Sequence, residues 1–465
     1  MCNGAPLGQG LVKGPSSESV APLPVQSVST PPVPPPVEIP PRAGAAEASV
    51  AVLIEQASAL ARVSGGSVLE CFTAIPDPRR RRGIRHSLAT ILGLGTAAVL
   101  AGQITLTDIT EWVATAGQQV LAGLGCRRDA RGRATAPHPD TVERVFTLLG
   151  AQGLADGIGA YLAENAGIGC VGVPIAAPEV LPAIAVDGKA VRGAIGADGQ
   201  IPYLLAAATH GQAVVIAERL VGPKSNEVPE FAPLLRGLAA RTAGVGGCVF
   251  TMDAGHTVRA HAQLITEELM AHYVMTVKEN TPTLFARIDA LDWAEVPITH
   301  QTEERGHGRR EQRTLRVLDA PADIGFPGAA QVFLIERYTT RTVRKPTKGS
   351  RSCKKVQIRT AVAVLGITSL SSREAAPEHL AGYVRGHWSI ENKIHWVRDV
   401  TFREDASQIR TASRFWVMAT LRNLAIGLIR QAGYTRVAAT IRKIRNNPHL
   451  LLAILGLPQP PTNTS

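Results

Sequence analysis

The stretch Ala183-Ile-Ala-Val-Asp187-Gly-Lys189 is an apolar run of strand length that leads into a carboxylate. A second stretch, Cys248-Val-Phe-Thr-Met-Asp253, repeats the arrangement. Short apolar runs bounded by turn residues predict buried strands, and such runs alternate with helix-like segments from residue 176 onward. Strands are expected at 182–187, 202–209, 213–219, 248–253 and 272–277, and helices at 227–241 and 257–269. The alternation predicts an α/β fold with a mixed sheet.

Segments of different composition surround this α/β region. The first 47 residues are rich in proline and serine, and their proline run excludes a helix or a central strand, so a disordered tail is expected. Apolar residues three and four apart predict helices further on, including a buried helix that begins at Leu88. The expected parts are a tail at 1–47, a helical domain at 48–165, an α/β domain at 176–440 with a β-rich insertion at about 295–368, and a C-terminal tail at 441–465.

The composition favours a polyanionic partner. Lysine and arginine number 49 against 38 aspartates and glutamates, which gives the 465 residues a formal charge of +11. Such an excess favours nucleic acid, although an ordinary basic soluble protein would show the same balance. The six cysteines are scattered without a CxxC pair, which argues against a zinc ribbon or a disulfide framework and fits a reducing cytoplasm. No signal peptide is recognised and no apolar stretch is long enough to span a bilayer, so a cytoplasmic protein without a membrane partner is expected.

Three carboxylates, Asp187, Asp253 and Glu391, suggest chemistry on phosphates. Aspartates that follow neighbouring buried strands are held rigidly and can share a divalent cation through oxygen ligands. A third carboxylate from a helix can complete a second metal position, and two metals about 4 Å apart can activate a water or a 3′ hydroxyl for attack at phosphorus. The alternative for each aspartate alone is an ordinary turn residue. Matching apolar runs before both aspartates, with Glu391 downstream, weaken that alternative.

The segment around Glu391 has helical spacing. His387, Glu391 and His395 are four residues apart. Arg398 follows Glu391 at seven, so all four side chains are expected on one face of a helix. The alternative is a solvated stripe of paired charges. A zinc site on the two histidines is a further alternative. It is only weakly supported, because the histidines are eight residues apart and lack the HExxH spacing.

Other segments have both a structural and a functional interpretation. Lys278 and Asn280 follow a strand, where they either hold a phosphate or a flipped base or form an ordinary turn. The arginine-rich stretch 75–86 is either a solvated loop or an arm that contacts phosphates. The segment at Arg309 is either a charged hairpin edge or a DNA contact. Structural roles alone are expected for the helix cap Lys224-Ser-Asn-Glu227 and for the core side chains Trp388 and Trp396.

These stretches resemble the DDE transposases of bacterial insertion sequences, in particular the type related to H-repeat-associated proteins. The resemblance covers roughly residues 65 to 455. Its most specific parts run from His387 to Gln408 and from Met418 to Ile426. Shorter matches are Ala185-Val-Asp-Gly-Lys189, Asp253-Ala-Gly-His256, Val277-Lys-Glu-Asn280 and His307-Gly-Arg309, and Ile75-Pro-Asp-Pro-Arg79 is similar to the small domain that precedes the catalytic core in this family.

The resemblance implies a ribonuclease-H-like mixed-sheet core with a β-rich insertion, preceded by a small helical transposase-associated domain that binds DNA. It implies that Asp187, Asp253 and Glu391 are catalytic and bind two magnesium ions, for which manganese can substitute. The implied activity is DNA cleavage and strand transfer at the terminal inverted repeats of an insertion sequence. A homo-oligomer would act on double-stranded DNA of the element ends and the target, in the bacterial nucleoid. DNA contacts are then expected from Lys189, His256, Lys278, Asn280, Arg309, His387, His395 and Arg398.

The chain departs from the broader class near the glutamate. Val384, His387 and Arg398 stand where many relatives carry tyrosine, arginine and lysine. The alternatives to an active enzyme are a catalytically inactive or domesticated DNA-binding relative and, between the two, a nuclease without strand transfer. The three intact carboxylates favour the active enzyme.

Overall fold

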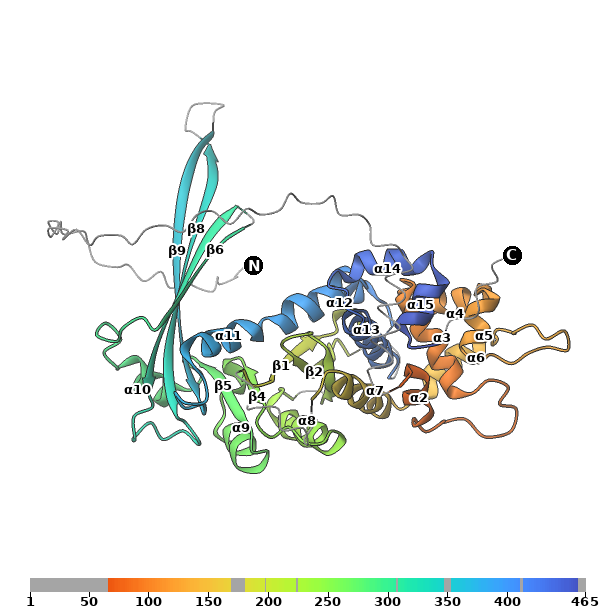
Figure 1. The fold of residues 1–465 in the computed structure, drawn as a ribbon, viewed down its shortest axis with the longest axis horizontal. Helices are drawn as coiled ribbons and strands as arrows, with labels where there is room; N and C mark the ends of the chain where they lie inside the picture. The colour runs from red at the N-terminus through yellow and green to blue at the C-terminus, as the bar shows by residue number, and fades with distance from the viewer. Residues whose placement is uncertain are drawn as a thin grey trace, which may run out of the picture. The chain divides into compact units, whose positions relative to one another are not determined.

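A mixed β-sheet organises the part of the chain that this computed structural model describes, residues 66–168, 180–196, 198–222, 225–306, 308–346, 353–409 and 413–458. Within those ranges nine strands form one sheet in the order β3-β2-β1-β4-β5-β9-β8-β7-β6 (Figure 1). The strands are β1 (Ala183–Ala190), β2 (Tyr203–Thr209), β3 (Val215–Val221), β4 (Val249–Met252), β5 (His272–Val277), β6 (His300–Gly306), β7 (Arg309–Asp319), β8 (Gln331–Pro346) and β9 (Cys353–Thr368). The tail expected at 1–47 lies outside the described residues.

Strands β1 to β5 confirm the strands predicted from apolar runs, each within three residues at either end. β1 is antiparallel to β2 and parallel to β4, and β4 is parallel to β5. Both faces of β1 are covered, because Ile184 and Val186 pack into the main core while Ala185 packs into a second cluster. The predicted mixed α/β fold is therefore confirmed.

Helices connect these strands as the sequence predicts. α8 (Val228–Arg241) follows β3 and packs against β2 and β3. α9 (Arg259–Gln263) follows β4 and passes into a π-helical turn, η3 (Leu264–Glu268), so the helix predicted at 257–269 is less regular than expected. α10 (Pro282–Asp289) then leads toward the insertion.

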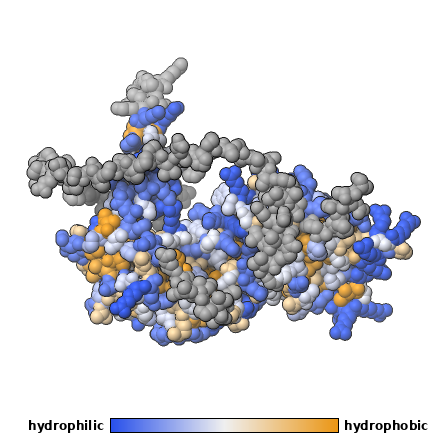
Figure 2. All heavy atoms as spheres, viewed as in Figure 1, coloured by the Kyte–Doolittle hydropathy of each residue, from blue (hydrophilic) through white to orange (hydrophobic). Residues whose placement is uncertain are grey.

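The insertion contributes four strands to the same sheet. β9 pairs antiparallel with β5, from Val274 opposite Thr368 to Val277 opposite Leu365. β8 and β9 pair along 16 residues each, whereas β7 pairs with β8 only as far as Arg341. The far ends of β8 and β9 therefore form a two-stranded ribbon, whose described surface is largely hydrophilic (Figures 1 and 2). Strands β6 to β9 occupy the segment predicted as a β-rich insertion, and they extend the central sheet.

Helices precede β1 in the described residues. They are α2 (Val68–Thr73), α3 (Leu88–Leu100), α4 (Leu106–Thr115), α5 (Gln118–Gly123), α6 (Pro139–Leu148) and α7 (Ala151–Asn165). Every residue of α3 is buried, which confirms the buried helix predicted from Leu88. α7 packs on β3, and this contact requires glycine at position 159, since a Cβ atom on Gly159 would lie 2.4 Å from the Ile216 carbonyl oxygen. These helices and the sheet belong to one compact unit, Ala48–Ser465.

The C-terminal helices return to the N-terminal ones. They are α11 (Pro377–His387), the π-helical turn η4 (Ile390–His395), α12 (Trp396–Val400), α13 (Arg414–Gln431), α14 (Val437–Arg445) and α15 (Pro448–Ile454). α13 is buried along most of its length, where it contacts α3, α7 and β3. α15 packs on α5, and the Val68 N–H donates to the Leu455 carbonyl at 3.4 Å. The expected boundary at residue 440 falls inside α14. The apolar side chains that follow residue 440 belong to the same core as the N-terminal helices.

None of the helices in the described ranges combines the length and the apolar character needed to cross a membrane.

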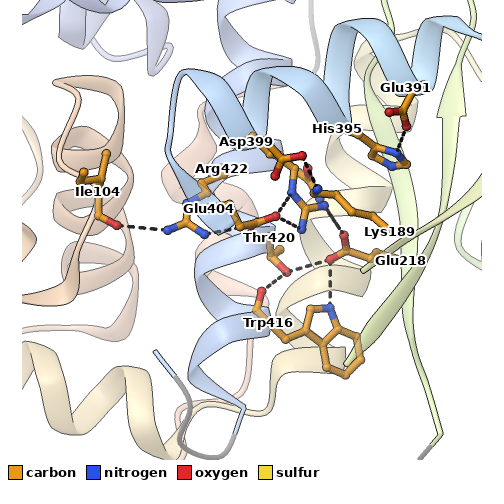
Figure 3. A network of polar contacts seen from close by, with 12 residues as sticks. Ile104, Lys189, Glu218, Glu391, His395, Asp399, Glu404, Trp416, Thr420 and Arg422 are labelled. Atoms are coloured by element: carbon orange, nitrogen blue, oxygen red, sulfur yellow. Dashed lines mark hydrogen bonds and ion pairs between the residues drawn. The ribbon is translucent and has the colours of Figure 1, made fainter. Parts of the chain in front are cut away.

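Buried charges tie the sheet to the C-terminal helices (Figure 3). Arg398 of α12 donates to Glu218 of β3 at 3.2 Å and to Glu404 at 2.8 Å. Arg422 of α13 donates to the other oxygen of Glu404 at 2.8 Å and to the Ile104 carbonyl at 3.1 Å. None of the four charged side chains is more than 3% exposed. Burial opposes ionisation of Glu404, but the charges of Arg398 and Arg422 outweigh it and lower its pKa to about 2.

Substitution of Arg398 tests this network. Arg398→Met leaves Glu218 and Glu404 buried without the cation between them, and we expect the free energy of unfolding to fall by about 3–5 kcal/mol. Urea unfolding followed by circular dichroism measures the change. The control is Arg385→Met, which removes an exposed partner of Glu304 and should change stability far less. Equal losses in the two variants would show that the buried network contributes no more than a surface pair.

Candidate metal centre

Two parallel strands bring Asp187 and Asp253 to neighbouring positions. The register pairs Val186 of β1 with Met252 of β4, so the next residue on each strand is an aspartate. β1 continues past Asp187 because it still pairs with β2, which leaves Asp187 half-buried, whereas Asp253 follows β4 and is exposed. Asp253 Oδ1 accepts the Gly255 N–H at 2.9 Å, which orients its carboxylate.

Glu391 reaches the same place from η4. Glu391 Oε2 lies 2.9 Å from His395 Nδ1, and that nitrogen lies 3.6 Å from Asp187 Oδ2. One ligand atom from each of these three residues lies within 4.8 Å of the others. The turn approaches β1 closely because Ile390 and Ile394 pack on small side chains of the sheet. These are Ala185, Ala206 and Ala208.

The π-helical turn changes which side chains share a face. In η4 the Trp396 N–H donates to the Glu391 carbonyl five residues earlier, so one residue is inserted relative to an α-helix. An inserted residue rotates all later residues by about 100°. Arg398 therefore points into the protein and joins the buried network, and the prediction that it lies on the same face as Glu391 is wrong.

A fourth carboxylate, Glu227, stands at the start of α8. A Cβ atom on Gly188, the residue after Asp187, would lie 2.0 Å from Glu227 Oε1, so this carboxylate rests directly against β1. His256 Nε2 lies 3.1 Å from Glu227 Oε2, and His256 is only 2% exposed. The helix start predicted at 224–227 agrees with α8, and Asn226 Oδ1 accepts the Val228 N–H at 3.2 Å, whereas the Glu227 side chain makes no capping hydrogen bond. Lys224, at the start of the predicted cap, lies outside the described residues.

The crowded carboxylates repel one another. Burial is the largest cause that raises the pKa of Asp187, followed by the charges of Glu227, Asp253 and Glu391, and the result is about 7. The hydrogen bond with His395 instead lowers the pKa of Glu391, while burial lowers the pKa of His395 itself. The positive groups nearby do not remove the repulsion that raises the pKa of Asp187. A hard divalent cation would, and clustered carboxylate oxygens are the ligands that it prefers.

The donors available to such a cation are Asp187, Asp253 and Glu391, with Glu227 and His395 beside them. Asp253 lies outside the group of ligand atoms within 4.8 Å, although its charge acts on Asp187. The alternative zinc site on two histidines is wrong, because among the described residues the group of close ligand atoms contains His395 without His387. His387 Nδ1 instead lies 3.3 Å from the hydroxyl of Thr251.

The residues expected to contact DNA fall into two groups. Exposed side chains are Lys278, Asn280 and Arg309. Residues with at most 7% of their surface exposed are Lys189, His256, His387, His395 and Arg398. Lys189 donates to Asp399 at 2.7 Å, His256 contacts Glu227 and Arg398 is sealed between two glutamates. These five side chains are buried in this structure, so their contacts with DNA stay a prediction.

A hollow of about 870 Å³ opens beside Asp253. Lys278 and Asn280 line it together with the aromatic side chains of Phe285 and Trp293. The Asn280 amide donates to the Ala254 carbonyl at 2.7 Å, which fixes its position next to the aspartate.

Two tryptophans flank Glu391 in the sequence. Trp388 is 58% exposed and Trp396 is 55% exposed, so the prediction that they lie in the core is wrong. The helix buries Ile390 and Ile394 against the sheet and leaves both indole rings exposed.

The raised pKa of Asp187 predicts a stability that depends on pH. Between its ordinary value of 3.8 and about 7, folded Asp187 holds a proton that the unfolded chain has lost, so the free energy of unfolding falls as pH rises through this window. In metal-free protein, Asp187→Asn should therefore stabilise the fold by about 1–4 kcal/mol at pH 8 and have almost no effect at pH 4. Thermal unfolding in chelator across this pH range measures it. A constant difference at all pH values would contradict the electrostatic explanation.

Comparisons with known proteins identify two family models that match the chain. The family model described as "Transposase DDE domain" matches residues 179–428, more than half of the chain, and the model described as "DDE_Tnp_1-associated" matches residues 69–162. The protein "Putative transposase YncI" of Escherichia coli O157:H7 is 26% identical over 374 residues, which cover 78% of this chain and 87% of that protein. "H repeat-associated putative transposase YhhI" of Escherichia coli K12 is 24% identical over 410 residues, or 84% of this chain and 98% of that protein.

Among solved structures, the piggyBac transposase synaptic complex with hairpin DNA aligns over 87% of this chain and 78% of that chain, with 12% identity and a TM-score of 0.38. A similarity of this extent carries no argument about the fold. The two family matches lie in the order expected from the sequence and include Asp187, Asp253 and Glu391. The chain therefore belongs to the DDE transposase family and carries the associated domain ahead of its DDE domain.

Proposed function

We propose that the protein catalyses divalent-metal-dependent cleavage of DNA and strand transfer at the terminal inverted repeats of an insertion sequence. The convergence of Asp187, Asp253 and Glu391 on one end of β4 carries this proposal. Carboxylates in this arrangement suit two-metal chemistry at a phosphodiester. We propose magnesium as the ion, with manganese as a substitute, because all the principal donors are hard oxygen atoms.

The core is proposed to be ribonuclease-H-like. The antiparallel run β1-β2-β3 followed by parallel strands β4 and β5 supports this assignment. The position of the insertion, between Asp253 and Glu391, supports it further.

The side chains around the centre have distinct proposed roles. When bound, the metal would activate the attacking oxygen and stabilise the leaving oxygen. Asp187 is fixed by its pairing with Ala206 of β2, and Glu391 is oriented by its hydrogen bond with His395, so the ligands need little rearrangement before cleavage. Lys278 and Asn280 are exposed beside Asp253, where they would contact the phosphate that is cut.

The insertion offers a basic surface for the DNA duplex. A hollow of about 900 Å³ is lined by Arg305, Arg309, Arg310 and Arg359, and the Arg359 guanidinium lies 4.8 Å from the centre of the Tyr338 ring. Arginines in such positions contact phosphates without reading sequence. We propose that two or more copies act together, since joining two element ends requires two sets of carboxylates.

Cleavage of an element end tests the proposal. The substrate is a labelled duplex that carries the DNA bordering the gene, incubated with magnesium, with manganese or with chelator. We expect nicking that depends on metal and that Asp253→Asn reduces by more than about 100-fold, the scale of losing a group that stabilises transition-state charge. Binding of the same duplex should stay within about threefold, because Asp253 contributes no positive charge to phosphate contacts.

Two other outcomes distinguish the alternatives. Specific binding without cleavage under any metal would identify an inactive or domesticated DNA-binding relative. Nicking without joining to a second duplex would identify a nuclease without strand transfer.

Glu227 is proposed to assist metal binding. Glu227→Gln should weaken the affinity for manganese by about 10–100-fold, as expected for loss of a group that supports the ligands. Isothermal titration calorimetry measures this without reference to cleavage. Glu230→Gln is the matched control, because Glu230 lies on the same helix but pairs with Arg219 at 2.9 Å. Unchanged affinity in Glu227→Gln would restrict the centre to the three carboxylates identified from the sequence.

A further inference from the structure

We infer that a groove in the N-terminal helical region binds the sugar–phosphate backbone of duplex DNA. This inference rests on the proposed function, which identifies the polyanion as DNA. The groove, called here the arginine groove, is formed by the loop that begins at Pro78, the loop that begins at Arg127 and α6. It shares no residue with the metal centre or with the basic hollow of the insertion.

Positive charge dominates the lining of the arginine groove. Its volume is about 1010 Å³. The basic side chains that line it are Arg79, Arg80, Arg82, Arg85, Arg127, Arg128 and Arg144, with His86 and His138. Among the described residues Asp129 is the only carboxylate in the lining, and its Oδ1 is already bonded to the N–H groups of Arg131 and Arg133 in its own loop. In Figure 2, hydrophilic side chains project over the N-terminal helices on the side where Figure 1 shows these loops.

Most of these arginines have no carboxylate partner. Arg79 is paired with Asp77. Within the described ranges, no ion pair is formed by Arg80, Arg82, Arg85, Arg127, Arg128 or Arg144. The insertion differs, because its Arg309, Arg310 and Arg313 are each paired with a glutamate of β6 or β7. The arginine groove is therefore a concave surface whose positive charge is left uncompensated by the described part of the protein.

The loop that carries these arginines is held in shape. Arg79 makes two hydrogen bonds to the Asp77 carboxylate and one to the His86 carbonyl at 3.0 Å, which fastens the two ends of the loop together. Burial lowers the pKa of His86, and the charges of Arg127, Arg79 and Arg85 lower it further, so guanidinium groups of both loops act on one point. Charges gathered before binding reduce the cost of ordering them on the ligand.

The chemistry of the lining favours the backbone over the bases. Guanidinium groups bind phosphate oxygens in a bidentate manner. The lining, as far as the structure describes it, contains no tryptophan, tyrosine or phenylalanine on which an unpaired base could stack, which argues against a single-strand site. Binding to phosphates is independent of the base sequence, and its affinity falls steeply as the salt concentration rises.

The test compares two triple variants of the full-length protein. Arg82→Gln/Arg127→Gln/Arg144→Gln removes three charges from the arginine groove. Arg236→Gln/Arg373→Gln/Lys443→Gln removes the same net charge from exposed positions outside it. The probe is a fluorescein-labelled DNA duplex of arbitrary sequence, about three helical turns long, with fluorescence anisotropy recorded over a series of salt concentrations. Circular dichroism and the unfolding midpoint confirm that both variants are folded.

We expect the groove variant to bind the duplex at least about tenfold more weakly at physiological salt. Its salt slope should fall by about 2–3, near one for each phosphate that the variant no longer neutralises. The control variant should keep the wild-type slope. Equal weakening in both variants would overturn the arginine groove, since it would reflect net charge alone, and so would unchanged binding in the groove variant. Tighter binding of a single-stranded RNA probe that depends on the same arginines would also overturn the assignment to duplex DNA.

The outcome is separable from that of the proposed function. The groove variant should retain metal-dependent cleavage when the duplex is saturating, because its carboxylates are intact. Wild-type protein that binds the duplex but never cleaves it would contradict the proposed catalysis while leaving the arginine groove in place.

Discussion

The buried ion pairs that Arg398 forms with Glu218 and Glu404 are the interaction on which the rest of this structure depends. They join β3, the short helix that follows Glu391 and the turn that carries Glu404. Glu218 also accepts hydrogen bonds from Trp416 at 3.0 Å and from Asn423 at 2.9 Å, so α13 is held in the same network. A charge removed from water at this depth is stable only when every partner is in place. The position of Glu391 over the sheet is therefore determined by this buried network as well as by the contacts of Glu391 itself.

The metal centre has the opposite electrostatic character. In the buried network, each charge has a partner of the other sign. At the metal centre, four carboxylates approach one another, and burial together with their repulsion raises the pKa of Asp187. Lys189 donates to Asp399, and its charge helps to lower the pKa of Glu391, but the pKa of Asp187 stays raised. The fold thus concentrates negative charge at the metal centre. It supports that centre with a buried network in which opposite charges are paired. Without a bound cation the carboxylates repel one another. A cation would relieve this repulsion, as expected at a site that binds one.

The sequence predicted the parts of the site that depend on local pattern. Apolar runs located β1 and β4, and the alternation of strands and helices indicated that Asp187 and Asp253 would be neighbours. Glu227 was missed, because its approach to Asp187 depends on how a hairpin and a helix fold back over the strand. Arg398 was misplaced, because periodicity assumes an α-helix throughout and cannot detect the inserted residue of a π-helical turn. The exposed tryptophans were misjudged for a similar reason, since which face of that helix packs on the sheet is decided by the alanines opposite it.

The packing of α15 on α5 has a consequence for the order of synthesis. The N-terminal helices are synthesised before the α/β region, yet Leu450, Leu451 and Leu452 of α15 belong to the same core. Contacts between such distant segments form only after the intervening chain has been made. A polypeptide released early would expose the apolar side of α3 and α5, and a complete one would cover it. The helical layer thus becomes fully folded only in molecules that already contain all three carboxylates.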